Sequence, residues 1–536
     1  MIEQVKTNYQ WWQTGVIYQI YPRSFKDTTG NGVGDLKGII QKLDYLSDTL
    51  GVDCLWISPF YPSPQLDFGY DVADFTDVDP LFGTLDDFDN LVKQAHRRGL
   101  KIIIDFVPNH TSDQHPWFIE SRSSRDNPKR DWYIWKDAKP DGSEPNNWLS
   151  VFGGRAWTWD ETTGQYYLHS FLKEQPDLNW RNPEVEAAMF DVMRFWLDRG
   201  VDGFRIDVAH FIMKDPEFRD NPAAYTPMHR DMGEYNHQKH LYDIGHEDVH
   251  IVFKKIRALL DEYSQASSRI GVAEIHEFDL EKWVSYYGEN FDELHFPFNF
   301  LLLTIPWTAT AVRTVVESLE TILPEGAWPN YVLGNHDEER IVSRYGRAQA
   351  RVAAMLLLTL RGTPTLYYGD EIGMPSAALT ESLDPWGQRL ESANRDVCRT
   401  PMQWDTSPNA GFTQDGIKTW LPISSDDAVA SQVNDNGSIL SLYQRLLAYR
   451  KTSAALQWGN YQNISDVPEH CFAYLREAEG RSVLVILSFS DEPKQFNVPS
   501  LGEGQLVLST HLDHDGKLDL AHISLRPHEG LLIELE

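Results

Sequence analysis

Gly203-Phe204-Arg205-Ile206-Asp207 is an apolar, strand-like run that ends in an acid. Three other runs end in a short polar cluster that also contains an acid. They are Ile102-Ile103-Ile104-Asp105 leading to Asn109-His110, Ile270-Gly271-Val272-Ala273-Glu274, and Tyr331-Val332-Leu333-Gly334 leading to Asn335-His336-Asp337. An ionised carboxylate at the end of a buried strand is costly unless it is paired or used. These endings therefore predict strands that deliver their acids to one rim, as in the parallel (β/α)8 barrel, whose active site lies at the carboxyl ends of its strands.

Strand-like segments alternate with amphipathic helical segments along most of the chain, which is the order of a parallel sheet. We predict eight strands, at residues 16–21, 54–60, 101–107, 203–208, 270–275, 294–298, 331–333 and 365–368. Helices are predicted between them, for example at 85–98 and 184–198, where apolar residues fall on one face. The predicted fold class is therefore α/β, a (β/α)8 TIM barrel.

The regular spacing breaks after the third strand, where almost a hundred residues rich in Trp, Pro, Gly, Asn and Asp precede the fourth. A loop of that length is usually functional or a small domain of its own. We predict an inserted subdomain at 109–178, over the mouth of a barrel made of 1–108 and 179–456. A polar lid or rim segment is expected at about 209–250. The short alternating segments of 457–536 predict a C-terminal antiparallel β-sandwich.

Composition excludes several classes of protein. The net charge is −31, from 48 basic and 79 acidic residues, which argues against nucleic acid and against an anionic membrane as partner. Three cysteines cannot all pair, and the first residues lack an apolar stretch of signal-peptide length. We therefore expect a cytoplasmic enzyme, either a monomer or a homodimer. The 18 Trp, 23 Tyr and 25 Phe residues suit the apolar faces of sugar rings.

The acids differ in their neighbours. Side chains alternate along a strand, so Arg205 and Asp207 share one face, and the Arg would hold the Asp ionised as a nucleophile requires. Glu274 has no adjacent Arg, so burial would raise its pKa, as a general acid requires. That division of labour is the one used in glycoside hydrolysis. Asp337 would form hydrogen bonds to ring hydroxyls. For each acid alone, a structural ion pair or a helix cap is the alternative.

The four polar endings resemble, in order and spacing, the four signature regions of the α-amylase superfamily (glycoside hydrolase family thirteen), and the resemblance covers essentially the whole chain. It implies Asp207 as nucleophile, Glu274 as general acid/base and Asp337 as transition-state stabiliser. It also implies that three residues bind the sugar in the −1 subsite, next to the cleaved bond: His110, Arg205 and His336. Asp105 would support Arg205.

Further matches resemble the α-glucosidase and oligo-1,6-glucosidase branch of that superfamily. Gln175-Pro176-Asp177-Leu178-Asn179 is similar to its fifth region. In Asp67-Phe68-Gly69-Tyr70-Asp71, the resemblance implies that Tyr70 stacks on the −1 glucose and that Asp67 meets its non-reducing end. Arg395 would join Asp67 and close the pocket behind one glucose, which implies exo-action on short substrates. An ordinary salt bridge between domains is the alternative. We also include Phe152 among the substrate-binding residues.

Val208 follows the nucleophile directly. In the branch that the chain resembles, Val at this position often accompanies α-1,6 cleavage, whereas Thr or Ala accompanies α-1,4 cleavage. The continuation Ala209-His210-Phe211-Ile212 departs from the usual oligo-1,6-glucosidase sequence. Val208 can also be read as an ordinary β-branched strand residue. The preferred linkage therefore stays open.

A Gly-rich loop near the N-terminus carries oxygen-bearing side chains at alternate positions, which is typical of a loop that binds Ca²⁺ or Mg²⁺. It resembles the metal loop of the α-glucosidase branch, which implies as ligands Asp27, Thr29, Asn31, Val33 and Asp35. Only two of these bring negative charge, so binding would be weak, and a plain Gly/Asp turn is the alternative. The ion would stabilise the fold without joining the chemistry. No organic cofactor is expected.

The sequence thus predicts a retaining, exo-acting α-glucosidase that cleaves α-1,4 and/or α-1,6 linkages in small oligosaccharides, together with transglucosylation. Its two reacting carboxyls should lie ~5–5.5 Å apart. Three alternatives stay open. A glucosyltransferase or isomerase on the same site, of the sucrose isomerase or trehalose synthase type, would be favoured by an apolar +1 site that excludes water. An α-amylase acting on long chains is disfavoured by Asp67, Gln175 and Arg395. A sugar-binding homologue without activity would lack at least one of the three acids.

Overall fold

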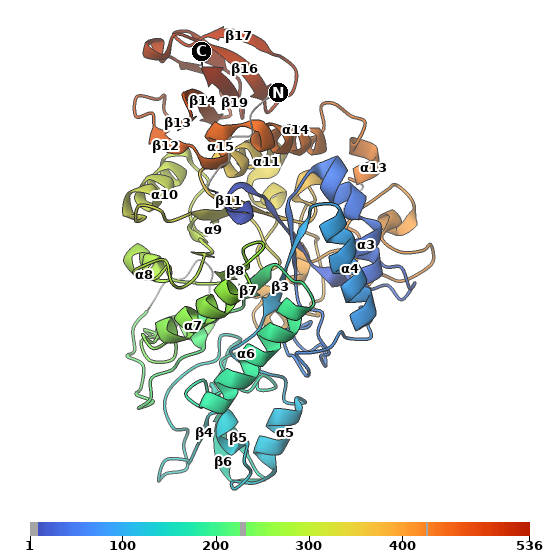
Figure 1. Cartoon of the computed structure of the whole chain (residues 1–536), viewed down its shortest axis with the longest axis vertical. Helices are drawn as coiled ribbons and strands as arrows, with labels where there is room; N and C mark the ends of the chain where they lie inside the picture. The colour runs from blue at the N-terminus through green and yellow to red at the C-terminus, as the bar shows by residue number, and fades with distance from the viewer. Residues whose placement is uncertain (1–8, 226–231, 425–426, 536) are drawn as a thin grey trace.

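Parallel strands form the centre of the molecule and confirm the predicted (β/α)8 barrel (Figure 1). The structure is a computed structural model that describes residues 9–225, 232–424 and 427–535. Within these residues the barrel strands are β1 (Ile17–Ile20), β2 (Cys54–Ile57), β3 (Lys101–Phe106), β7 (Gly203–Ile206), β8 (Ile270–Ala273), β9 (Phe296–Pro297), β10 (Asn330–Val332) and β11 (Thr363–Tyr367). The ladder runs β10-β11-β1-β2-β3-β7-β8-β9, and each pair of neighbours is parallel.

Helices surround the strands, as the alternation of segments predicts (Figure 1). They include α3 (Leu36–Gln41), α4 (Leu85–Arg97), α6 (Pro183–Asp198), α7 (Val249–Glu262), α8 (Leu280–Ser285), α10 (Ala309–Ile322), α11 (Ile341–Thr359) and α14 (Ile439–Thr452). Helix α4 begins at a capping box made by Thr84 and Asp87, and it buries Phe88, Leu91 and Ala95. Because helices cover the strands on the outside, strands β1, β2, β7 and β8 are buried at every position.

The fourth barrel strand is shorter than predicted. It ends at Ile206, so Asp207 and Val208 lie beyond it. Val208 adopts the left-handed conformation, with φ 34° and ψ 45°. This conformation is strained for a β-branched residue. The interpretation of Val208 as an ordinary strand residue is therefore wrong, because the chain turns sharply there into the short 3-10 helix η3 (Ala209–Phe211).

The insertion after β3 has its own elements: α5 (Pro116–Ser123) and a three-stranded antiparallel sheet of β4 (Trp135–Lys136), β5 (Trp157–Asp160) and β6 (Gln165–Leu168). Its two ends meet, because His110 forms an antiparallel bridge with Asp177 and Tyr133 forms one with Leu178. The insertion lies at the far end of the molecule from the C-terminal strands (Figure 1). The region after β7 contains η4 (Gly233–His237), and residues 226–231 of the predicted lid lie outside the described residues.

The C-terminal region is an antiparallel β domain, as predicted. Its larger sheet has the order β12 (Asn460–Asn463), β13 (Cys471–Ala478), β14 (Arg481–Ser488), β19 (Gly530–Leu535), β16 (Glu503–Ser509) and β17 (Gly516–Asp519). A second pair joins β15 (Lys494–Phe496) to β18 (Ile523–Leu525). A hydrophobic cluster that includes Leu484, Ile486 and Phe496 is buried within this domain.

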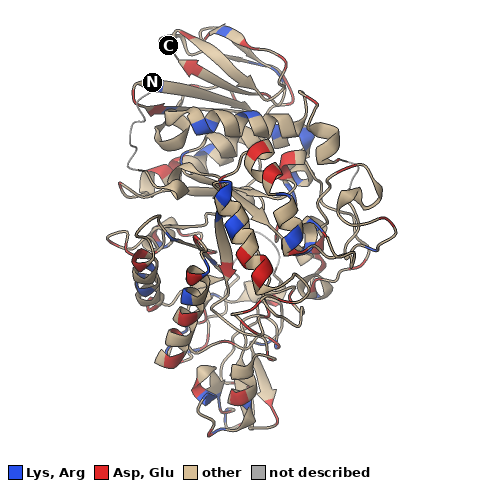
Figure 2. Cartoon of the chain, turned by 45° about the vertical axis from the view of Figure 1, so that its right-hand side comes forward, with Lys and Arg blue, Asp and Glu red and all other residues tan. Residues whose placement is uncertain are grey.

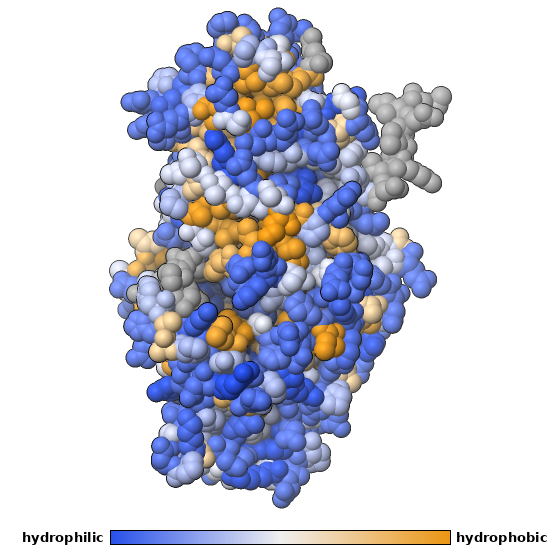
Figure 3. Space-filling view, turned by 90° about the vertical axis from the view of Figure 1, so that its left-hand side faces the viewer, coloured by the Kyte–Doolittle hydropathy of each residue, from blue (hydrophilic) through white to orange (hydrophobic). Residues whose placement is uncertain are grey.

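The surface agrees with the composition. Acidic and basic residues are spread over the outer helices, while the barrel strands carry few (Figure 2). The face shown in Figure 3 is mostly hydrophilic. No helix among the described residues is long and apolar enough to cross a membrane.

Candidate active site

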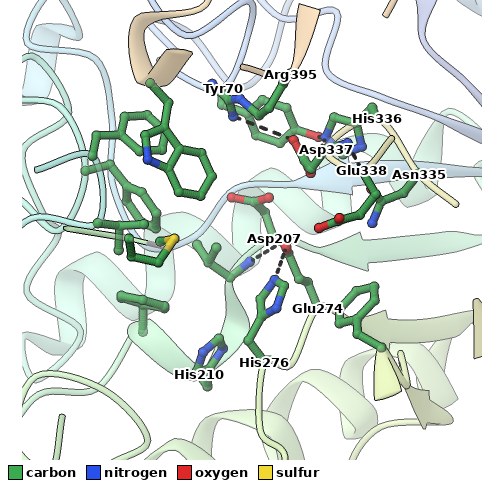
Figure 4. Close-up of a pocket in the computed structure, with 18 of the residues that line it drawn as sticks. Tyr70, Asp207, His210, Glu274, His276, Asn335, His336, Asp337, Glu338 and Arg395 are labelled. Carbon is green, nitrogen blue, oxygen red and sulfur yellow. Dashed lines mark hydrogen bonds and ion pairs between the residues drawn. The ribbon is translucent and has the colours of Figure 1, made fainter. Parts of the chain in front are cut away.

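A pocket lies at the carboxyl ends of the barrel strands, and most of the predicted site residues line it (Figure 4). They come from the segments after β2, β3, β7, β8 and β10, and from the long segment that follows β11. The predicted residues in the lining are Asp67, Tyr70, His110, Phe152, Asp207, Val208, Glu274, His336, Asp337 and Arg395. Arg205 and Gln175 lie directly behind them, in contact with Asp207 and Asp67 respectively.

The guanidinium of Arg205 holds three carboxyl groups together. Nη1 donates to Asp105 and to Oδ1 of Asp207 (2.6 Å), and Nη2 donates to Oε2 of Glu274 (2.6 Å). The strand register explains this convergence, because Arg205 pairs with Asp105 on β3 and with Val272, two residues before Glu274, on β8. All four groups are buried. One cation therefore holds the carboxyls of Asp207 and Glu274, the predicted nucleophile and acid/base, close together.

The predicted pKa directions of the two carboxyls, an ionised Asp207 and a raised pKa for Glu274, are both wrong. Burial acts to raise the pKa of Glu274, but Arg205 and a contact with His276 (Nε2 to Oε1, 2.8 Å) outweigh it, and the pKa lies well below its usual range. Burial instead raises the pKa of Asp207 well above its usual range, and the charges of Glu274 and Asp105 add to the rise against Arg205. The two carboxyls titrate as a pair, and without a ligand the pair's proton favours Asp207.

Asp337 is held ionised on the opposite wall. Arg399 Nη2 donates to its Oδ1 (2.7 Å), and Nε2 of His336 lies 3.3 Å from its Oδ2. Burial opposes ionisation of Asp337, but His336, Arg399 and Arg395 together hold its pKa far below the usual range. Burial also lowers the pKa of His336 to about 3, so the ring is neutral. Its Nε2 contacts the hydroxyl of Tyr70 (2.7 Å), and the two rings stack at 5.5 Å.

The inner end of the pocket is closed by charged side chains. Arg395 Nη2 donates to Asp67 (2.7 Å) and to Asp384 (2.5 Å), and Gln175 Nε2 donates to the other oxygen of Asp67 (3.0 Å). Gln175 also contacts His110 (3.2 Å). These groups are buried, so Asp67 and Arg395 form the predicted pair.

Two aromatic rings cover this closed end. Phe152 of the insertion stacks on Trp386 at 5.1 Å, and the Arg395 guanidinium lies 5.1 Å from the centre of the Phe152 ring. Phe152 and Trp386 are 234 residues apart in the sequence. Their contact shows that the insertion and the segment after β11 together complete one wall. These two rings and the ion pairs of Arg395 with Asp67 and Asp384 together form the wall at this end of the pocket.

The rest of the pocket lining is mostly apolar, and we call this part the mouth. It includes Met232, Tyr235, Phe278, Phe300 and Leu303, whereas Val151, Phe171, Phe211 and Ile244 cluster with Phe152 and Trp386 of the inner end. Several come from the segment after β7, within the predicted lid. Two histidines, His210 and His276, lie on the same side of the pocket, away from Tyr70 and His336 (Figure 4).

Sequence reasoning missed some residues of the site, chiefly His276, Asp384, Trp386 and Arg399. Asp384 precedes a Pro and caps α12 (Pro385–Arg389), so its sequence context indicates an ordinary helix start. His276 lies two residues after Glu274 on the same strand exit, and that spacing was the available signal. Arg399 lies in the segment that contains Arg395, four residues further on.

The predicted metal loop satisfies its acids from within. Asp27 accepts hydrogen bonds from the amides of Thr29, Gly30 and Gly32 (each 2.8 Å) and from the hydroxyl of Thr413 (2.6 Å). Asp35 accepts from Gly38 and caps α3. Asn31 is exposed, and its oxygen accepts from the amide of Val33. This arrangement leaves few oxygen lone pairs for an ion, so the donor set does not fit a cation well. A structural metal here stays a prediction.

Comparison with known proteins agrees with the geometry. Residues 19–459 match the family described as "Alpha amylase, catalytic domain". The "Probable alpha-glucosidase" of Rhizobium meliloti (strain 1021) is 44% identical over 532 residues, which cover 95% of each chain. The "Oligo-1,6-glucosidase" of Heyndrickxia coagulans is 39% identical, over 98% of this chain and 100% of that one. The solved structure of "alpha-glucosyl transfer enzyme, XgtA" is 42% identical, covers 98% of this chain and 100% of its own, and superposes with a TM-score of 0.92.

Proposed function

The chain belongs to the α-amylase family, and we propose that it is a retaining, exo-acting α-glucosidase that removes terminal α-linked glucose from short oligosaccharides. The observation that carries this proposal is the closed inner end, where Arg395 joins Asp67 and Asp384 directly behind the reacting carboxyls. An enzyme that cuts within long chains needs an open cleft on both sides of the cleaved bond. The relatives named as glucosidases support the same conclusion.

In the proposed mechanism, Asp207 attacks the anomeric carbon while Glu274 protonates the leaving oxygen. The covalent glucosyl-enzyme is then hydrolysed by water from which Glu274 removes a proton. Sharing of one guanidinium by both carboxyls supports the short separation of retaining enzymes, ~5–5.5 Å rather than ~6.5–9.5 Å. Retention of the α configuration follows from the two successive displacements.

Substrate would shift the proton of the pair from Asp207 towards Glu274 before this chemistry begins. The glycosidic oxygen accepts a hydrogen bond, so its arrival beside Glu274 favours the protonated form of that group. The partial positive charge that develops at the anomeric carbon favours the ionised form of Asp207. The resting arrangement therefore becomes the reactive one only when a sugar fills the site.

The remaining polar groups suit the −1 subsite. Asp337, held ionised by Arg399 and His336, can accept hydrogen bonds from ring hydroxyls as they tighten in the transition state. Tyr70 offers a flat ring face to the sugar. Asp67 and Arg395 meet the non-reducing end. Val208 stays unassigned between α-1,4 and α-1,6 linkages.

The apolar mouth specifically favours a second activity on the same site, transfer of the glucosyl group to an acceptor other than water. Among the described lining residues the mouth offers mostly aromatic and aliphatic side chains, and such a surface binds an acceptor while it excludes water. The similarity to the structure named as an α-glucosyl transfer enzyme supports this alternative. Isomerisation of a disaccharide would be the intramolecular form of the same transfer.

The charges of the pocket favour neutral sugars. Asp67, Asp207, Glu274, Asp337 and Glu338 line it, whereas Arg395 is the one Lys or Arg in the described lining, and it is paired. An anionic substrate would be repelled. A cytoplasmic location is also proposed, because all three cysteines are free. The quaternary state, monomer or homodimer, stays a prediction.

The test is a proton NMR time course on an equimolar mixture of maltose, isomaltose and sucrose. We expect α-glucose to appear before β-glucose, and the disaccharide that disappears first identifies the preferred linkage. New glucosides or an isomerised disaccharide in place of glucose would assign the transfer activity. If the disaccharides persisted while longer maltooligosaccharides were cut, the closed inner end would not determine specificity and the proposal would fail.

A further inference from the structure

His276 contacts the oxygen of Glu274 that is free to carry a proton. Arg205 Nη2 (2.6 Å) and the amide of Val208 (3.2 Å) both lie against Oε2. Both are N–H donors, so a hydrogen on Oε2 would face two other hydrogens. The proton that Glu274 gives to a leaving group therefore belongs on Oε1. That is the oxygen that lies 2.8 Å from Nε2 of His276.

The ring of His276 is held in place and is still accessible. It stacks on Phe300, with the ring centres 4.7 Å apart and the planes 18° from parallel. Its side chain is 35% exposed, compared with 9% for Glu274. The ring lines the mouth of the pocket next to His210, whose ring centre is 6.1 Å away (Figure 4). His276 thus connects the buried acid to solvent at the mouth.

We propose that His276 is a positioning residue for the general acid/base: it fixes the direction of Oε1 and shares one proton with it. The proton moves between Oε1 of Glu274 and Nε2 of His276, and no other bond changes. This inference rests on the proposed function, because it assigns a partner to the acid of that reaction. With the proton on Oε1 the pair is ready to protonate a leaving group. With Oε1 ionised, a hydrogen on Nε2 stabilises the general base of the second step.

The surrounding charges favour retention of this proton. Asp105 on β3 and Asp337 after β10 are acids that face Glu274, and each opposes loss of a proton from the His276–Glu274 pair; Asp207 after β7 does so only when it is ionised. Arg205 on β7 acts in the opposite direction, and His210 is a neutral neighbour because burial lowers its pKa to about 3. The His276–Glu274 pair can hold its proton on either of two atoms. It therefore keeps that proton to a higher pH than Glu274 alone would.

The decisive experiment compares pH profiles of kcat/KM for an aryl α-glucoside in wild type, His276→Gln and His276→Phe. A Gln amide can contact Oε1 but cannot take up a proton. We expect His276→Gln to stay within about threefold of wild type on the acidic side. Its alkaline limb should shift down by about one pH unit, which is about a fivefold loss at the old midpoint. His276→Phe keeps a ring on Phe300 but loses the contact, so it should lose activity at all pH values.

The matched control is His250→Gln. His250 contacts Glu293 through Nδ1 at 2.7 Å and is 29% exposed, so it is a similar His–Glu pair, but it lies outside the pocket lining. Its pH profile should overlay that of wild type. An overlay of the His276→Gln profile on the wild-type profile would overturn the proposal.

A second measurement does not depend on activity. In protein labelled with ¹³C at the histidine Cε1 position, the His276 signal is identified by its loss in His276→Gln and is titrated in wild type and in Glu274→Gln. We expect the titration midpoint of His276 to fall by at least about one pH unit when Glu274 loses its charge. An unchanged midpoint would contradict proton sharing. If the wild-type chain cleaved no α-glucoside, the proposed function would fail, and this titration would still decide the inference.

Discussion

At its inner end the pocket is lined by charged groups that hold one another in place, whereas its mouth is lined by aromatic and aliphatic side chains. Arg395 is fixed between Asp67 and Asp384, and Asp337 is fixed by Arg399 and His336. At the mouth, Phe278 is 37% exposed and no comparable ion-pair network orders the described apolar lining. A rigid charged end selects one sugar ring strictly, while an apolar mouth binds many partners loosely. The comparison predicts large effects for changes at the inner end and small, selective effects for changes at the mouth.

The largest effect is expected at Asp207, the proposed nucleophile. Asp207→Asn removes the group that forms the covalent intermediate, so kcat should fall by on the order of 10⁴-fold or more. Azide added to Asp207→Gly with α-glucosyl fluoride as substrate should yield the β-glucosyl azide, identified by its anomeric proton coupling in NMR. An α-azide product would mean that Asp207 is not the nucleophile. Circular dichroism spectra that match wild type would exclude misfolding as the cause of the loss.

The next largest effect is expected from opening the closed end. Arg395→Met leaves the buried carboxylates of Asp67 and Asp384 unpaired, and loss of one partner of a buried ion pair costs about 3–5 kcal/mol. We expect kcat/KM for maltose to fall by roughly 10²–10³-fold. Arg389→Met is the control, because Arg389 is exposed and donates hydrogen bonds to the backbone carbonyl oxygens of Phe152 and Gly153 instead of pairing with Asp67. Equal losses in both variants would mean that the closed end does not determine specificity.

The elements that could be predicted from sequence are those governed by local pattern. The buried strands and the acids that follow them share one chain segment, so periodicity and composition find both. Cross-strand contacts are different: Arg205 reaches Glu274 because β7 and β8 are in register, and spacing along one strand does not contain that information. Likewise the left-handed conformation of Val208 is imposed by the turn after β7. Asp384, eleven residues from Arg395, was hidden by its role as a helix cap.

A neutral, buried histidine at the inner end should make stability depend on pH. The pKa of His336 is lowered from 6.5 to about 3 in the folded chain. Below pH 6.5 the unfolded chain takes up a proton that the folded chain refuses, so this contribution to stability is lost as the pH falls from 6.5 towards 3. Between pH 7 and pH 5 the wild type should therefore lose about 2 kcal/mol of unfolding free energy relative to His336→Gln, so the difference between the two proteins shrinks.

Denaturant unfolding at the two pH values measures this gap. His336→Asn serves as a second variant, since it also lacks the imidazole. Its absolute stability can differ from that of His336→Gln, but its pH slope should be the same. A gap that stayed constant, or widened on acidification, would contradict a neutral His336.

A smaller and more selective effect is expected at the mouth. Phe278→Ser replaces an exposed apolar side chain by one that attracts water, so the ratio of hydrolysis to transfer should rise about threefold at high maltose concentration. The rate of glucosyl-enzyme formation should change little. Leu383→Ser is the control, because Leu383 is 50% exposed and lies outside the pocket lining. The ratio is measured by NMR of the products, and an unchanged ratio would mean that the mouth does not select the acceptor.

The smallest effect is expected from removal of divalent cations. The acids of the loop around Asp27 are satisfied by its own amides and by Thr413, so dialysis against EDTA should leave both the melting temperature and kcat/KM unchanged. Differential scanning calorimetry before and after dialysis, with Ca²⁺ or Mg²⁺ added back, measures the change. A melting temperature that fell and was restored by one of the ions would show that the loop binds a structural metal.

The closed end also governs how molecules pass through the site. Because Arg395 and Asp67 block the inner side, the leaving group and the next acceptor must use the same opening, one after the other. In the proposed mechanism the glucosyl group would stay on Asp207 until that opening clears. Whichever molecule arrives first then receives it, so the concentration of sugar outside decides the product. When sugar is scarce the enzyme would release glucose, and when sugar is abundant it would build longer saccharides, without any separate regulatory site.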